Sequence, residues 1–156
     1  MIYPIEFPKN YLTAKYHRQL KRGKVVDTIK PCRAILYRIS KLDKVEIWNK
    51  PLVNFISPVK AIVANDGKSV ITIDDWHSKG YEHTFVLYGE NGKLIKDFEL
   101  KDISPFPLEQ YLHTRSSIHW GGNVEFLDND RVEILFRNEK GEEQKRIFNI
   151  KTRIFE

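Results

Sequence analysis

Two short segments contain most of the side chains in this sequence that could carry chemistry. Residues 74–83 read Asp-Asp-Trp-His-Ser-Lys-Gly-Tyr-Glu-His, and residues 113–120 read His-Thr-Arg-Ser-Ser-Ile-His-Trp. Functional side chains concentrate on loops that a rigid scaffold positions, so we expect these two loops to form the site. The candidate residues are Asp74, Asp75, Trp76, His77, Ser78, His83, His113, Arg115, Ser116, Ser117, His119 and Trp120.

One interpretation of the loops is a metal site, because imidazole and carboxylate ligands together suit zinc and related ions. Either aspartate of the first loop could act with the histidines of both loops. Each loop separates its two histidines by six positions, which matches no common ligand spacing. The sequence therefore predicts no bound metal and no cofactor.

A second interpretation is hydrolysis, with a loop serine as nucleophile, a histidine as base and an aspartate that orients the histidine. The serines available are Ser78, Ser116 and Ser117. None lies in the Gly-x-Ser-x-Gly turn that exposes the nucleophile of many hydrolases. A small hydrolase or metal-dependent enzyme that uses residues 74–83 and 113–120 is kept as the alternative function.

Two further interpretations involve neither catalysis nor a metal ion. Polar side chains in tight loops often satisfy backbone groups, and Trp76 and Trp120 could fill the core. Alternatively, exposed Trp, Tyr, Arg and His side chains could contact a partner. We expect a non-catalytic binding or protein-interaction domain, since the sequence has no strong catalytic motif.

Hairpins must position these loops. Apolar residues alternate along segments rich in β-formers, which predicts strands at 33–39, 45–48, 59–63, 69–73, 84–88, 93–98, 124–127, 132–136 and 146–150. Glycine-containing turns at 65–68, 90–92 and 138–141 supply the positive φ that tight hairpins need. The one helical segment, 100–112, is limited to short turns by Pro105 and Pro107. Gly121-Gly122 is interpreted as a bulge or turn, and Cys32 as a buried thiol.

The charge of the chain is unevenly distributed. The net charge is +5, yet residues 9–24 contain six Lys or Arg and no acid. We divide the chain into a basic leader, 1–32, and a single β-rich domain, 33–156. The leader could bind phosphates or simply stay solvated; the solvated form is favoured because no stacking platform follows, and nucleic-acid binding is not expected.

The sequence does not decide in which cellular compartment the protein works. No apolar run approaches the 18 residues of a membrane span, and the first residues lack the pattern of a signal peptide. We expect a soluble protein that is either cytoplasmic or exported with its signal removed.

The two strand–turn–strand units around Asp66-Gly67 and Asn91-Gly92 together resemble a four-stranded β-propeller blade. Residues 57–80, with Trp76-His77-Ser78 and later Arg115-Ser116-Ser117, are similar to a set of uncharacterised bacterial proteins, many of them exported. The resemblance covers roughly residues 33–136. It implies a blade-like fold and brings no known activity or cofactor.

The chain holds about two and a half blade-sized units, at 33–50, 59–99 and 124–155. Closed propellers use 4–8 blades, so we predict a mainly β, antiparallel meander of blade-like hairpins, a partial propeller-like sheet or sandwich with one or two short helices. Its open sheet edges could pair with another protein or with a second copy of the chain.

Overall fold

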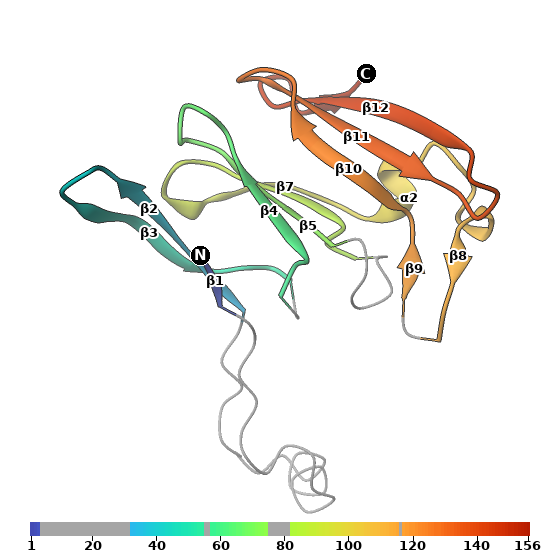
Figure 1. Cartoon of the computed structure of the whole chain (residues 1–156), viewed down its shortest axis with the longest axis horizontal. Helices are drawn as coiled ribbons and strands as arrows, with labels where there is room; N and C mark the ends of the chain where they lie inside the picture. The colour runs from blue at the N-terminus through green and yellow to red at the C-terminus, as the bar shows by residue number, and fades with distance from the viewer. Residues whose placement is uncertain (4–31, 55–56, 75–81, 116) are drawn as a thin grey trace, which may run out of the picture.

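The computed structural model describes residues 1–3, 32–54, 57–74, 82–115 and 117–156, in which three antiparallel sheets lie side by side (Figure 1). The first sheet contains β1 (Ile2–Tyr3), β2 (Arg33–Ile39) and β3 (Lys44–Pro51). The central sheet contains β4 (Lys60–Val63), β5 (Val70–Ile73), β6 (Phe85–Tyr88) and β7 (Leu94–Phe98). The third sheet contains β10 (Gly121–Phe126), β11 (Arg131–Arg137), β12 (Glu143–Asn149) and β13 (Ile154–Phe155). The predicted mainly β fold of antiparallel hairpins is confirmed.

Short elements complete the chain. The 3₁₀ turn η2 (Glu90–Gly92) joins β6 to β7, while α2 (Leu100–Ile103) and η3 (Leu108–Gln110) lead to a small ribbon of β8 (Leu112–His113) and β9 (Ile118–His119). Prolines follow α2, as expected, so the helical segment is divided into two single turns. Within the described residues no helix has the length and apolar character that crossing a membrane requires.

The central sheet is buried on both faces. Every residue of β5 and β6 is buried, and alternate side chains of a strand point to opposite faces. On one face, Ile71, Ile73, Phe85 and Leu87 join the apolar cluster shared with the third sheet. On the other, Val70, Val86 and Tyr88 join the cluster shared with the first sheet. The central sheet is therefore the middle layer of three.

Aromatic rings dominate the contact between the central and third sheets. The ring centroids of Phe85 and Phe148 lie 5.0 Å apart, and those of Phe98 and Phe155 lie 5.4 Å apart. The far face of the third sheet is polar instead, with ion pairs such as Lys145–Glu133 at 2.8 Å. The stack of sheets thus ends on this side in a charged surface.

The contact between the first and central sheets is smaller. Trp48, Ala34 and Leu52 pack there together with Cys32. Cys32 is fully buried, as the sequence predicts, and burial raises the pKa of its thiol. Of the leader, residues 2–3 pair with β2 as β1. Its basic cluster lies outside the described residues.

The predicted turns are also present. Gly67 and Gly92 have φ of 70° and 68°, in the left-handed region that glycine adopts without a steric penalty. The pairing of β10 with β11 shifts register between Gly121 and Val124. The interpretation of Gly121-Gly122 as a bulge or turn is confirmed.

Alanine at Gly92 should destabilise the fold more than alanine at Gly67. Both changes place a Cβ at positive φ, which costs about 1–2 kcal/mol. At Gly92 the Cβ would also lie 2.8 Å from Lys50 Cγ and 3.0 Å from Trp48 Cε3, whereas at Gly67 nothing lies within 4 Å. We expect an additional loss of about 1–3 kcal/mol for Gly92→Ala in urea unfolding. Equal losses for the two variants would contradict the packing of Trp48 on this turn.

Stability should fall at high pH through Tyr88. Burial raises the pKa of the Tyr88 hydroxyl to about 12, above its ordinary value of about 10. The folded state therefore holds this proton more tightly, and its contribution is complete below pH 10 and lost between pH 10 and 12, at up to about 1.4 kcal/mol per pH unit. In urea unfolding across pH, the stability difference between wild type and Tyr88→Phe should be constant up to pH 9 and decrease above pH 10. A difference that stays constant to pH 12 would refute this assignment.

Candidate functional site

The two predicted loops meet at their bases. The indole nitrogen of Trp120 donates to the backbone oxygen of Asp74 at 3.1 Å, and both residues are buried. Trp120 also packs on Phe136, with ring centroids 5.2 Å apart. Four candidates of the first loop, Asp75, Trp76, His77 and Ser78, lie outside the described residues, as does Ser116. The described residues of this junction, Trp120 and Asp74, contact each other inside the core.

His83 contacts one residue of a strand and one residue of a loop. Its Nδ1 lies 2.8 Å from Oδ2 of Asp97 on β7, and its backbone oxygen accepts from the side-chain amide of Asn54 at 3.1 Å. The His83 and Asp97 side chains are about one-third exposed. The contact joins an imidazole to a carboxylate that the sequence analysis did not single out.

The polar side chains of the second loop contact the loop itself and the neighbouring turn η3. The hydroxyls of Thr114 and Ser117 lie 2.9 Å apart, and the His113 ring nitrogen Nε2 lies 2.9 Å from the Leu108 backbone oxygen. Arg115 and His119 are exposed. Among the described residues, no group of three or more His, Cys, Asp or Glu is placed to hold a metal ion.

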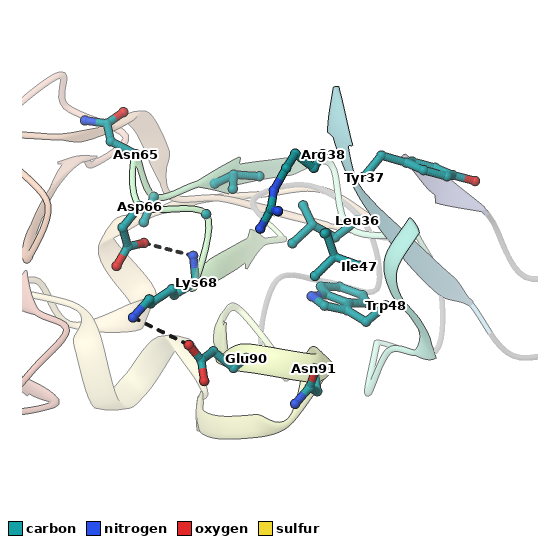
Figure 2. Close-up of a pocket in the computed structure, with 13 residues that line it drawn as sticks. Leu36, Tyr37, Arg38, Ile47, Trp48, Asn65, Asp66, Lys68, Glu90 and Asn91 are labelled. Carbon is teal, nitrogen blue, oxygen red and sulfur yellow. Dashed lines mark hydrogen bonds and ion pairs between the residues drawn. The ribbon is translucent and has the colours of Figure 1, made fainter. Parts of the chain in front are cut away.

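A cavity of about 580 Å³ lies elsewhere, between the β2–β3 hairpin and the turns of the central sheet (Figure 2). Of the predicted site residues that the structure describes, none lines it. Leu36, Ile47, Trp48 and Val63 form its apolar part, while Asn65, Asp66, Lys68, Glu90 and Asn91 lie on its polar side. Tyr37, Arg38, Ala64 and Gly67 complete the lining.

Strand length explains why the cavity forms there. β2 and β3 have seven and eight residues, whereas β4, β5 and β6 have four each. At about 3.3 Å per residue, the hairpin is longer than the strands it covers. Its register also shifts at Ile47, which has no Cα partner between the pairs Leu36–Trp48 and Tyr37–Glu46. Such a bulge bends its strand and increases the twist, at the point where the cavity opens.

Trp48 separates the cavity from the core between the sheets. It is only 5% exposed, and its ring packs against the turn at Gly92. Figure 2 shows the indole nitrogen on the side of the ring that faces the cavity. In the described part of the chain, every buried side-chain nitrogen or oxygen has a partner. Because no acceptor among the described residues is paired with the indole N–H, this donor belongs to the small exposed part of Trp48.

Charges of both signs line the cavity. Lys68 Nζ lies 3.6 Å from Glu90 Oε1, and Asp66 Oδ1 accepts the backbone N–H of Lys68 at 2.9 Å. Figure 2 shows the Arg38 side chain extending into the cavity from β2. Arg38 forms no ion pair within the described residues. This guanidinium is therefore available to a ligand.

A comparison of the chain with protein-family models, with curated proteins and with solved structures finds no match. The resemblance to proteins with blade-like repeats stays a prediction.

Proposed function

We propose that this chain is a non-catalytic interaction domain that holds an extended segment of a partner protein in the cavity between the β2–β3 hairpin and the central sheet. The observation that carries the proposal is the lining of the cavity, which is apolar on one side and polar at the turns. Binding sites combine these two features, because apolar surface provides affinity and a few placed polar groups fix orientation.

The polar side of the cavity suits a peptide. Asn65 and Asn91 are exposed and come from two different turns. A carboxamide both donates and accepts hydrogen bonds, as does each peptide group of an extended chain. The turns that carry these side chains are the ends of a buried sheet, so they would hold the amides in place before a partner arrives.

The open sheet edges are a less favourable place for a partner or a second copy. Proline, lysine and bulges protect edge strands from pairing, and β3 contains Lys44, Lys50, Pro51 and the bulge at Ile47. On the third sheet, β10 also has a register shift. These features favour the cavity over edge pairing as the site of interaction.

We further propose that the central and third sheets are blade-like units. Each has four antiparallel strands in chain order, and neighbouring sheets pack through buried apolar faces. Propeller blades are built from four-stranded sheets in the same way. Blade-like scaffolds suit a binding role, because their turns present side chains while the sheets stay rigid.

Narrowing the cavity should abolish binding. We would titrate ¹⁵N-labelled protein with pools of tetrapeptides that are acetylated at one end and amidated at the other. A binding pool should shift the Trp48 indole signal and the backbone signals of 65–68 and 90–92. Val63→Phe should lose these shifts, because Val63 lines the cavity and is 44% exposed.

Val59→Phe is the matched control, since Val59 is 50% exposed and lies outside the cavity lining. It should bind like the wild type. The proposal fails if no pool causes shifts, if Val63→Phe binds as well as Val59→Phe, or if the shifts centre on His83 and Asp97.

One observation favours a second candidate, a small hydrolase. The His83–Asp97 contact of 2.8 Å has the geometry of a base and the carboxylate that orients it. The nucleophile would have to come from a neighbouring segment, such as the loop that contains Ser78.

Ester hydrolysis separates the two candidates. An interaction domain predicts that the wild type and His83→Gln hydrolyse 4-nitrophenyl acetate at the same rate, because the other histidines are retained in both. A hydrolase predicts a loss of about 100-fold or more in His83→Gln and a smaller loss in Asp97→Asn. Such losses, in variants with unchanged thermal unfolding, would replace the proposed function with the second candidate.

A further inference from the structure

We infer that the segment held in the cavity carries a carboxylate next to a branched apolar side chain, and that Arg38 binds this carboxylate. The inference rests on the proposed function and adds the chemistry of the ligand. It follows from the one cation of the cavity that the described residues leave without an ion pair.

Arg38 differs from most other arginines of the described residues. Arg131 and Arg137 are paired with Asp128 and Glu143. Arg33 donates to Asn49, and Arg146 donates to the backbone oxygen of Ile103. Arg38, Arg115 and Arg153 are exposed and form no such side-chain contact within the described residues, and of these three only Arg38 lines the cavity.

Trp48 offers a second donor to the same cavity. Figure 2 shows Arg38 and the indole of Trp48 on one side of the cavity, with Asp66 and Lys68 on the other. A guanidinium presents several N–H donors in a planar fork that fits a carboxylate, and the indole N–H of Trp48 adds one more. A carboxylate on this side of the cavity would be bound through charge-assisted hydrogen bonds.

The other charged side chains of the cavity lie on its turn side. Lys68 lies 3.6 Å from Glu90, and the Asp66 carboxylate accepts the Lys68 backbone N–H. Arg38 on β2 is therefore the lining cation that forms no ion pair within the described residues.

Apolar side chains surround this donor pair. Leu36 and Ile47 line the cavity beside Trp48, and Ile47 is 36% exposed. A Leu, Ile or Val side chain next to the carboxylate would cover these residues and exclude water from the Arg38 contact. Exclusion of water strengthens the charged hydrogen bonds.

The test uses four short peptides and the ¹⁵N signal of the Trp48 indole. Ac-Leu-Asp-Leu-NH₂ supplies a side-chain carboxylate, Ac-Leu-Asn-Leu-NH₂ is its uncharged isostere, and Ac-Leu-Lys-Leu-NH₂ reverses the charge. Ac-Leu-Leu-Leu-OH supplies the carboxylate from the chain end. We expect the Asp peptide to bind at least about tenfold more tightly than the Asn peptide, as hydrogen bonds to a charged group imply. Tighter binding of the free-terminus peptide would identify the chain end as the source of the carboxylate.

Arg38→Gln should remove the preference for the carboxylate, so that the Asp and Asn peptides bind alike. Arg38→Lys should retain part of it, since lysine keeps the charge and loses the planar fork. Arg115→Gln, at an exposed arginine outside the cavity, should leave the preference unchanged.

Each other result overturns the inference. Equal binding of the Asp and Asn peptides to the wild type, or tighter binding of the Lys peptide, refutes the carboxylate and leaves the interaction domain intact. Retained preference in Arg38→Gln refutes the role of Arg38. Absence of binding by all four peptides also refutes the carboxylate, whereas the proposed function is tested separately by the tetrapeptide pools and the Val63→Phe and Val59→Phe variants.

Discussion

The burial of the central sheet on both faces is the constraint on which the rest of the structure depends. A sheet whose strands β5 and β6 are buried at every position needs an apolar layer on each side. The third sheet supplies one layer with its Phe, Val and Ile side chains, and the first sheet supplies the other with Trp48. The third sheet then ends the stack, because its outer face carries ion pairs such as Arg137–Glu143 and Lys145–Glu133 around Leu135 and Ile147.

The cavity follows from a mismatch within this stack. A two-stranded hairpin of seven- and eight-residue strands covers a sheet whose strands have four or five residues. Trp48 fills the space between the first and central sheets near Gly92. On the far side of Trp48, the β2–β3 hairpin extends past the strands of the central sheet. Apolar residues that would otherwise enter the core, such as Leu36 and Ile47, therefore line an open space beside the polar turns.

The loops rich in polar residues show why residue type is a weak guide to chemistry. In the second loop, Ser117 bonds to Thr114, and Trp120 bonds to the backbone of Asp74. These contacts satisfy groups that folding removes from water. His83 is the one described candidate whose contact also fits catalysis, and its partner, Asp97 on β7, is a carboxylate that the sequence analysis did not single out.

The sequence by itself determined the hairpins, because alternation of apolar residues and glycine turns at Gly67 and Gly92 act over a few neighbouring residues. It also determined that Cys32 is buried and that Gly121-Gly122 is irregular. Only the tertiary structure decided where a ligand could bind. The cavity joins Arg38, Asn65 and Asn91 from three separate hairpins, and their proximity depends on strand lengths, a bulge and the packing of layers. None of these is visible in local spacing, since each arises from contacts between distant parts of the chain.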